Sequence, residues 1–356
     1  MYTDNIHIID IPKKVVVGHD ILDRADVFLR MVYPRGARVH LVTGPNVYSR
    51  FYPRLRAALE GAGFELSYSI ADDASVETAR RVAEEAREID ADVIIGFGGG
   101  RSIDLAKFAA KESGKSFVSM PTVASHDGIT SPFASLRGFE KPMSVKAKTP
   151  DLILIDVDVV ASAPRRYNMA GFGDLIGKFT SVRDWRLAHK LRGEYYGEYS
   201  ASLALLSARH VSAYYREIAL GTRTGLRVLL EALVSSGVAM GIAGSTRPAS
   251  GSEHLFAHAL SMVAENKPLH GEAVGVGTIL MAYLHGLAWR KIKRLLKRVG
   301  LPVTARELGV SEDEVIKALV MAARIRPERY TILGERGLTR EAAEELARRT
   351  GVIERV

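Results

Sequence analysis

Three histidines and one aspartate have residue types and spacing that could bind a metal in this sequence of 356 residues. His254 and His258, in GSEHLFAHAL, would share one face of a helix because side chains four positions apart are neighbours there. His270 follows in PLHGEAVGVG, at the start of the next apolar segment. Two histidines with one carboxylate make a three-ligand zinc site that keeps a fourth position open for catalysis. Asp174, in AGFGDLIGKF, is the best candidate for that carboxylate.

The alternative to a metal site is a histidine pair that packs in the core with its hydrogen bonds satisfied. All three segments are rich in glycine and small residues, which suit the close approach of a ligand and favour the metal interpretation. The sequence contains no cysteine, so thiolate ligands, thiolate catalysis and disulfides are excluded. Any metal must therefore be held by His, Asp or Glu.

A glycine-rich loop is the strongest single feature. In IIGFGGGRSIDLAKFAA an apolar run leads through Gly98, Gly99 and Gly100 directly into a helical pattern. Such a loop lets the backbone approach a phosphate, and the free N–H groups of the helix start bind it, so we expect a seat for a diphosphate. The spacing departs from the dinucleotide fingerprint because Arg101 stands where the third glycine should be. A tight turn is the alternative, and Asp104 would then only complement the helix dipole.

Polar side chains follow the next apolar run, in MPTVASHDGITSP. Thr122, Ser125, Thr130 and Ser131 offer hydroxyls at the carboxyl end of a predicted strand, where open α/β sheets bind ligands. Asp127 would face the same crevice. The alternative is an Asx-type turn without a ligand.

These residues require two kinds of scaffold. The first half alternates short apolar runs (KVVVG, RVHLVTG, FELSYSI, DVIIGFG, KSFVSM and DLILIDV) with helical patterns, which predicts a mostly parallel, doubly wound sheet. Residues 129–150 predict a hairpin insertion, a flap over a site. The apolar spacing of the second half predicts a succession of helices. We place the nucleotide-binding α/β domain at residues 1–162 and an all-helical domain that binds metal and substrate at residues 163–356.

Composition limits the protein class. Hydrophobic residues make up 47% and charged residues 25% of the chain, as in soluble globular proteins. No apolar run approaches the roughly 18 to 20 residues of a membrane span, and the polar start lacks a signal peptide, so we expect a cytoplasmic protein without membrane insertion.

The basic residues behind the net charge of +8 are scattered along the chain, and binding of small anionic ligands would account for this charge. Missing glutamine with abundant Arg and Glu fits a thermophile. The basic segment WRKIKRLLKRVG suits a solvated amphipathic helix, with a membrane surface or nucleic acid as alternatives.

The order of these motifs resembles the archaeal sn-glycerol-1-phosphate dehydrogenases, within the wider family of glycerol dehydrogenases, iron-containing alcohol dehydrogenases and dehydroquinate synthases. The resemblance rests on GFGGGRSIDLAK, MPTVASHDGITSPFAS, GFGDLIGK, SGSEHLFAHAL and LHGEAVGVG, and covers nearly the whole chain. The second and fourth of these motifs are the more specific. Arg101 is then no anomaly, because the family pattern is G-G-G-x-x-x-D and ends here at Asp104.

The resemblance implies a dehydroquinate synthase-like fold: a Rossmann-like α/β domain followed by an all-α domain. It implies zinc, one ion per subunit, held by Asp174, His254 and His270, with Asp174 also touching the substrate. Asp127 and His258 would contact the substrate. The cofactor, NAD or NADP, would be held by Gly98, Gly99, Gly100, Arg101, Ser102, Thr122, Val123, Ala124, Ser125 and Ser131.

The implied activity is that of an NAD(P)-dependent oxidoreductase acting on a CH–OH group. It would reduce dihydroxyacetone phosphate reversibly to sn-glycerol 1-phosphate, the backbone of archaeal membrane lipids. Zinc would polarise the ketone, and His258 would hydrogen-bond a substrate hydroxyl or relay its proton. The site is expected between the domains. Alternatives within the superfamily are a glycerol or polyol dehydrogenase and a lyase like dehydroquinate synthase.

Several points stay open at this level. The substrate phosphate needs cations, and the sequence does not choose among Arg101, Lys146, Lys148, Arg165 and Lys178. No acidic residue near Asn46 and Arg50 would reject a 2′-phosphate, so we expect both NAD and NADP to be used. A basic protein that binds nucleic acid is the alternative outside enzymes, and the intact motifs argue against it. Apolar helices and the resemblance favour a homo-oligomer.

Overall fold

The computed structural model describes residues 7–138 and 143–354 and divides into two compact units, each described here on its own. The first unit holds residues up to 123, residues 128–160 and residues 237–246; the second holds residues 124–127, 161–236 and 247–356. The main division, between residues 160 and 161, lies beside the expected boundary. Two short segments belong to the unit on the other side of this division: residues 124–127 belong to the helical unit, and residues 237–246 belong to the α/β unit.

The first unit is built on a six-stranded parallel sheet in the order β1-β8-β5-β4-β2-β3. These strands are the six apolar runs of the sequence, so the predicted fold class is confirmed. Their bounds are β1 Lys14–Gly18, β2 Arg38–Thr43, β3 Glu65–Ile70, β4 Val93–Gly98, β5 Ser116–Pro121 and β8 Leu152–Asp156.

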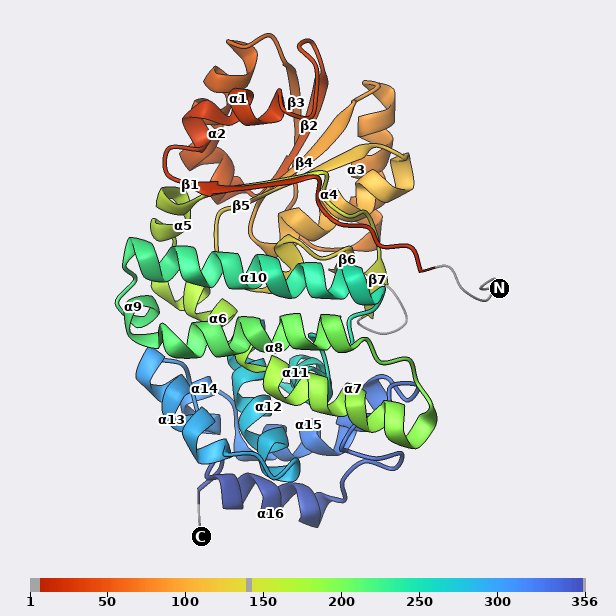
Figure 1. The fold of residues 1–356 in the computed structure, drawn as a ribbon, viewed down its shortest axis with the longest axis vertical. Helices are drawn as coiled ribbons and strands as arrows, with labels where there is room; N and C mark the ends of the chain where they lie inside the picture. The colour runs from red at the N-terminus through yellow and green to blue at the C-terminus, as the bar shows by residue number, and fades with distance from the viewer. Residues whose placement is uncertain (1–6, 139–142, 355–356) are drawn as a thin grey trace. The chain divides into compact units, whose positions relative to one another are not determined.

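Both faces of this sheet are covered by helices, which is why its central strands read as unbroken apolar runs. Successive side chains of a strand point to opposite faces. Ile95 packs in the core that contains residues of α1 (Ala25–Leu29) and α2 (Pro45–Glu60). Its neighbour Ile94 packs in the core formed with α3 (Val76–Glu88) and α4 (Gly100–Ser113). Figure 1 shows the two helix pairs on opposite sides of the sheet.

The predicted hairpin insertion is present as β6 (Phe133–Leu136) and β7 (Met143–Lys146), which pair antiparallel. Residues 139–142, between the strands, lie outside the described part. Asp104 ties this hairpin to α4: its Oδ2 accepts from the backbone N–H of Ser135 at 3.1 Å. The buried Lys107 donates to the carbonyl oxygens of Gly128 at 2.6 Å and Phe133 at 2.7 Å. Asp104 thus anchors the insertion rather than only complementing a helix dipole.

The second unit is helical. Its most buried helix is α12 (His270–Leu284), which packs against α6, α7, α11, α13 and α16. Almost every residue of α12 is apolar or small, as expected for a helix covered on all sides. The other helices are α6 Arg165–Ile176, α7 Lys178–Arg192, α8 Glu198–Ala213, α9 Tyr215–Ala219, α11 Ser252–Val263, α13 Trp289–Val299, α14 Ala305–Leu308, α15 Glu312–Ile325 and α16 Arg340–Thr350. Helices α5 (Val157–Ala161) and α10 (Arg223–Ala243) run across the division between the units.

Helix α10 corrects the expectation that no segment is long and apolar enough to cross a membrane. Its 21 residues satisfy that test by length and composition, with a mean hydropathy of 1.6 over the most apolar 18-residue window. However, 61% of the window is buried in the structure. Burial of this extent is what a core helix shows, and α10 is therefore weak evidence for a membrane span.

Helix α13 has the amphipathic form expected of WRKIKRLLKRVG. Ile292, Leu296 and Val299 are buried on one side, whereas most of its basic residues are exposed. Lys293 is the exception, since its ammonium donates to the carbonyl oxygens of Thr350 and Gly351 at 2.9 and 2.6 Å.

Candidate active site

Helices α6 and α12 cross so closely that only glycine fits at the crossing. A Cβ atom on Gly173 would lie 2.1 Å from the carbonyl oxygen of Gly271, and one on Gly271 would lie 1.8 Å from that of Ala170. A predicted metal ligand adjoins each of these glycines: Asp174 follows Gly173 in α6, and His270 precedes Gly271 in α12. The glycines therefore bring the aspartate of one helix beside the histidine at the start of the other.

Asp174, His254 and His270 form one cluster, in which one ligand atom from each residue lies within 4.8 Å of the others. Oδ1 of Asp174 lies 3.2 Å from Nε2 of His254 and 3.9 Å from Nε2 of His270. Ligand atoms of a tetrahedral zinc ion are about 3.3 Å apart when each bond is about 2.05 Å. The donor set and spacing therefore fit a divalent metal. The side chain of His270 is 40% exposed, which leaves room for a further ligand.

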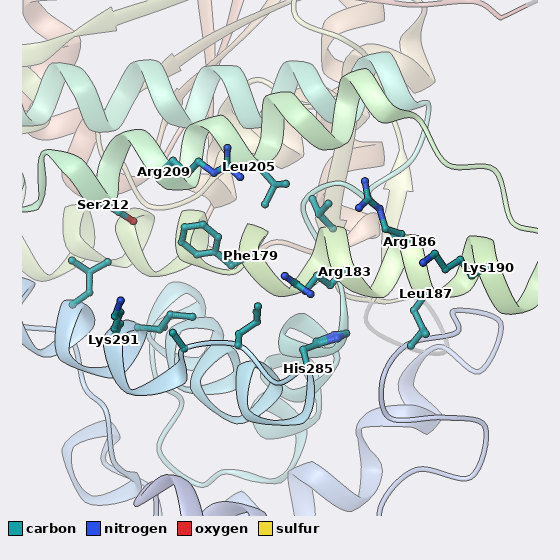
Figure 2. A pocket seen from close by; sticks show the side chains of 15 residues that line it. Phe179, Arg183, Arg186, Leu187, Lys190, Leu205, Arg209, Ser212, His285 and Lys291 are labelled. Carbon is teal, nitrogen blue, oxygen red and sulfur yellow. The ribbon is translucent and has the colours of Figure 1, made fainter.

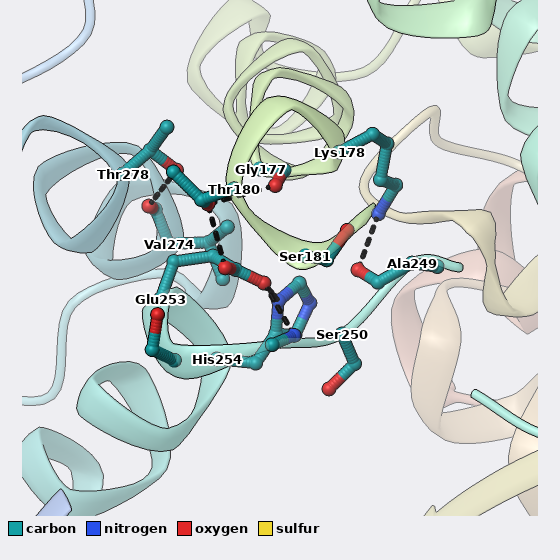
Figure 3. A network of polar contacts seen from close by, with 12 residues as sticks. Gly177, Lys178, Thr180, Ser181, Ala249, Ser250, Glu253, His254, Val274 and Thr278 are labelled. Carbon is teal, nitrogen blue, oxygen red and sulfur yellow. Dashed lines mark hydrogen bonds and ion pairs between the residues drawn. The ribbon is translucent and has the colours of Figure 1, made fainter. Parts of the chain in front are cut away.

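Glu253 holds the ring of His254 from the other side (Figure 3). Its Oε1 lies 2.8 Å from Nδ1 of His254 and accepts from the backbone N–H of Gly251 at 2.6 Å. The hydroxyl of Thr180 donates to Oε2 at 2.6 Å. Burial lowers the pKa of His254, but the carboxylates of Asp174 and Glu253 outweigh it and raise this pKa above its usual value. A metal at Nε2 would take the place of the proton there, while Glu253 keeps the proton on Nδ1. Glu253 is completely buried and therefore held in one position.

A buried lysine fixes the second oxygen of Asp174. Nζ of Lys178 lies 3.2 Å from Oδ2 of Asp174 and 2.8 Å from Oδ2 of Asp127, and it donates to the carbonyl oxygen of Ala249 at 3.1 Å. Figure 3 shows the contact with Ala249. Burial raises the pKa of Asp174, but the charges of Lys178 and His254 more than offset it and hold this pKa well below its usual value. Asp174 is thus ionised, with Oδ1 left for the histidines.

Asp127 lies in the same network. Its backbone N–H donates to Oδ2 of Asp174 at 3.2 Å, and the hydroxyl of Ser236 donates to Oδ2 of Asp127 at 2.7 Å. Burial lowers the pKa of Lys178, but the two aspartates outweigh it and raise this pKa above its usual value. One cation therefore bridges two carboxylates that the sequence separates by 47 positions.

His258 lies beside the cluster of Asp174, His254 and His270. The centre of its ring is 5.7 Å from that of His270 and 6.5 Å from that of His254. Burial, with the positive charges of His254, Arg326 and Arg329, lowers the pKa of His258 to about 3. The imidazole is therefore neutral near pH 7, where it can donate or accept a hydrogen bond but is not a ready proton source.

The glycine loop brings together several of the residues predicted to hold the cofactor. The backbone N–H of Thr122, after β5, donates to the carbonyl oxygen of Gly98, at the end of β4, at 2.9 Å. A Cβ on Gly98 would lie 2.6 Å from Oγ of Ser102, and one on Gly99 would lie 3.4 Å from the side chain of Val123. Gly99 is the N-cap of α4, and no side chain within the described residues makes a capping hydrogen bond to the first turn of this helix. The arrangement suits a bound diphosphate.

The remaining predicted cofactor residues divide between the units. Ser131, in the first unit, is buried, and its hydroxyl donates to the carbonyl oxygen of Phe133 at 3.3 Å. Ala124 and Ser125 belong to the second unit, where the N–H of Ala124 donates to Oδ1 of Asn168 at 2.9 Å. The hydroxyl of Thr130 is buried and has no hydrogen-bond partner within the described residues.

The structure reduces the set of cations proposed for a substrate phosphate. The guanidinium of Arg165 donates to the carbonyl oxygens of Ala219 and Val299, at the ends of α9 and α13. These hydrogen bonds give Arg165 a structural role and make it a poor candidate for a phosphate ligand. Lys178 is fully buried between two carboxylates. Two further cations, Arg326 and Arg329, were not among the residues predicted from the sequence; after burial and the charge of His254, their charges also lower the pKa of His258.

Comparison with known proteins gives this site a context. A family model described as iron-containing alcohol dehydrogenase matches residues 16–164. The chain is 68% identical to the glycerol-1-phosphate dehydrogenase [NAD(P)+] of Aeropyrum pernix over 99% of this chain and 100% of that protein. It is 54% identical to the enzyme of the same name from Sulfurisphaera tokodaii, over 98% and 99% of the two chains. The chain belongs to the glycerol-1-phosphate dehydrogenase family.

The resemblance seen in the sequence is thereby confirmed. Solved structures support the fold of this glycerol-1-phosphate dehydrogenase family member. A glycerol dehydrogenase from Schizosaccharomyces pombe matches 96% of the chain with a TM-score of 0.80 at 21% identity, and 90% of that protein is covered. At this identity the likeness shows the shared architecture alone.

Three groups of residues in this family member were not predicted from the sequence. Glu253 directly precedes His254. A carboxylate beside a predicted metal ligand at a helix start is the sequence signal that could have identified it. Arg326 and Arg329 follow the end of α15 in RIRPERY, where a proline and clustered arginines mark a loop. Thr180 and Ser236 carried no sequence signal, because only the fold brings their hydroxyls to Glu253 and Asp127.

Proposed function

We propose that this protein is an NAD(P)-dependent sn-glycerol-1-phosphate dehydrogenase that binds a divalent metal, zinc in our assignment. The observation that carries the proposal is the cluster of Asp174, His254 and His270 in a chain 68% identical to a glycerol-1-phosphate dehydrogenase. The reaction adds a hydride to the ketone carbon of dihydroxyacetone phosphate and a proton to its oxygen. It is reversible, and its product would enter the synthesis of membrane lipids.

We propose separate roles for the bound metal and cofactor and for the residues of the chain. When bound, the metal supplies a Lewis acid for the ketone oxygen and the nicotinamide supplies the hydride. Asp174, His254 and His270 would hold the metal. Lys178 keeps Asp174 ionised and oriented, and Glu253 keeps a proton on Nδ1 of His254, so that the metal would bind at Nε2 in place of the proton there. Such supporting contacts orient ligands and tune their basicity.

Neighbouring residues of the cluster are proposed to bind the rest of the substrate. Asp127 and the neutral ring of His258 would hydrogen-bond the substrate hydroxyl. Because burial and the neighbouring positive charges lower the pKa of His258 to about 3, the ring carries only one of its two possible N–H protons at neutral pH. It can pass one on only by donating through one nitrogen while accepting at the other.

We assign the substrate phosphate to Arg326 and Arg329. Arg329 donates to the carbonyl oxygen of Ser250 at 2.6 Å, next to Ala249, which accepts from Lys178. Burial and the positive charges of Arg326 and Arg247 lower the pKa of Arg329 to about 9. The side chain of Arg326 makes no hydrogen bond or ion pair within residues 7–138 and 143–354. Like charges crowded in this way are stabilised by an anion, and arginine suits phosphate.

The cofactor is proposed to bind with its diphosphate at the start of α4. Gly98, Gly99 and Gly100 leave room for the phosphates, and the helix start supplies N–H donors. The first turn of α2, after β2, contains no acidic residue that would repel a 2′-phosphate. This supports use of both NAD and NADP, which agrees with the bracketed cofactor in the names of the relatives.

A paired assay tests the proposed function. We expect NADH oxidation with dihydroxyacetone phosphate to exceed that with unphosphorylated dihydroxyacetone by at least about a hundredfold, because two charged contacts would be lost. A chelator should abolish turnover, and zinc should restore it. Comparable rates with both ketones would instead indicate a polyol dehydrogenase, and no net NADH oxidation a lyase. The metal content of the purified protein distinguishes zinc from iron.

The role of Glu253 gives a second prediction. Glu253→Gln keeps the size of the side chain but weakens the hold on Nδ1 of His254, so the affinity for zinc should fall about 10- to 100-fold. Competition with a zinc-binding dye measures this affinity directly, without activity. Glu265→Gln, at an exposed position near the end of the same helix, is the matched control and should leave zinc affinity unchanged. Unchanged affinity in Glu253→Gln would remove Glu253 from the proposed centre.

A further inference from the structure

A pocket of about 680 Å³ opens in the helical unit, on a surface that includes none of the metal ligands. It is lined by α7, α8, α13 and the segment before α13, as Figure 2 shows. Its apolar wall comes from Phe179 and Val182 of α7, Leu205 of α8 and Ile292 and Leu295 of α13. A volume of this size is typical of sites for small molecules.

Cations surround this apolar wall on three helices. They are Arg183, Arg186 and Lys190 of α7, Arg209 of α8 and Lys291 of α13. Figure 2 shows that Arg209 and Lys291 come from helices on either side of α7. None of the described lining residues is acidic.

Most of these cations are not neutralised by the protein. Arg186 has an exposed partner, Glu198, at 3.5 Å. The side chains of Arg183, Lys190, Arg209 and Lys291 have no hydrogen bond or ion pair in the part of the chain that the structure describes. Arginine and lysine at solvated surfaces commonly pair with acids across a helix turn, as Arg227 does with Glu231. Four unpaired cations around one apolar pocket therefore favour an anion there.

The apolar wall decides what kind of anion. An inorganic anion or a nucleic-acid backbone would use the cations and leave the wall in water. A second copy of this chain, related by a twofold axis, would place the same cations against each other, and the chain already carries a net charge of +8. A small molecule with an anionic head and a hydrocarbon tail satisfies both parts of the surface.

We propose that this pocket is a binding site for a single-chain anionic amphiphile, whose tail packs on Phe179, Leu205 and Leu295 while its phosphate or similar head contacts Arg183, Arg209 and Lys291. The site is separate from the metal cluster and does not depend on the proposed reaction. It gives a role to Lys291 of α13, which the proposed reaction does not use.

Calorimetric titration with dodecyl phosphate, below its critical micelle concentration, tests this proposal on the full chain. We expect one binding site per chain. Each methylene buried contributes a factor of about four, so octyl phosphate should bind more than tenfold more weakly. Dodecyl maltoside, with the same tail and a neutral head, should also bind at least tenfold more weakly. Inorganic phosphate binding as tightly as dodecyl phosphate would overturn the proposal, since the tail would then contribute nothing.

Variants locate the site. Arg183→Glu with Arg209→Glu should weaken dodecyl phosphate binding more than tenfold, and Leu205→Glu should do so by making the wall polar. Arg294→Glu, exposed on α13 outside the pocket, is the matched charge control and should change the affinity less than twofold. Melting temperatures close to that of the unaltered protein show that each variant folds. If Arg294→Glu weakened dodecyl phosphate binding equally, the binding would reflect general charge attraction and the proposal would be overturned. Dissociation of an oligomer during the titration would also overturn it, because the pocket would then be covered by another copy of the chain.

Discussion

Replacement of His254 by alanine is expected to lower the turnover of dihydroxyacetone phosphate at least about a thousandfold, while NADH still binds. In our proposal the ring supplies one of three metal ligands, and Nε2 lies 3.2 Å from Oδ1 of Asp174. A Lewis acid contributes several kcal/mol to such a reaction, and about 4 kcal/mol corresponds to a thousandfold in rate. The cofactor residues of the glycine loop lie in the other unit and are not touched by the change.

The measurement separates loss of metal from loss of fold. Zinc content, NADH fluorescence and steady-state rates are followed in His254→Ala and in His210→Ala, a control histidine exposed on α8. The first variant should lose zinc and turnover and keep NADH affinity within about threefold, whereas the control should keep all three properties. A His254→Ala enzyme that turns over at normal rates without metal would contradict the assignment of this cluster.

The local pattern of the sequence was sufficient to predict the α/β half of the fold. Each of the six strands is an apolar run bounded by turn residues, and helices with period-3.6 spacing separate them. Burial on both faces of a parallel sheet leaves this signature in the strands themselves, as the packing of Ile94 and Ile95 on opposite faces illustrates. The hairpin at Phe133–Leu136 and Met143–Lys146 was predicted from its glycine and proline residues.

The partners inside the metal cluster could not be predicted in the same way. The glycine crossing of α6 with α12 brings Asp174 beside His270. Helix α11, which packs against α12, then places His254 next to Asp174, although 80 positions separate the two residues. The sequence indicated the ligand types because imidazole and carboxylate are recognisable, and the resemblance supplied the pairing. Lys178 was a phosphate candidate because the sequence around a lysine does not show whether its side chain is buried. In the structure, its ion pairs with Asp127 and Asp174 place it in the cluster.

The membrane criterion failed for a physical reason. Helix α10 combines Arg223, Arg227 and Glu231 with a long apolar remainder, so inspection of unbroken apolar runs missed a helix whose average hydropathy is high. Core helices and membrane spans share that average, and burial in the protein distinguishes them. Arg326 and Arg329 were missed because arginines near a helix end usually complement the helix dipole. Their action on His258 is a property of the fold.

The proposed phosphate site leads to a second large effect, on substrate selection. Arg326→Leu and Arg329→Leu should each lower kcat/KM for dihydroxyacetone phosphate about 10- to 100-fold, because a hydrogen bond to a charged group contributes about 1.5 to 3 kcal/mol. The double variant should lose about a thousandfold, and the rate with unphosphorylated dihydroxyacetone should stay the same in all of them. This contrast separates a phosphate contact from general damage, which would lower both rates.

The matched control for these variants is Arg324→Leu, at an exposed position in the last turn of α15, two residues before Arg326. It removes the same charge from the same helix end and should change kcat/KM less than twofold. Arg329 also donates to Ser250, so its variant should lose some thermal stability, and Arg326, which has no such bond within the described residues, should not. If Arg324→Leu weakened the phosphorylated substrate as much as Arg326→Leu, the effect would come from the overall positive field, and the phosphate would have to bind elsewhere.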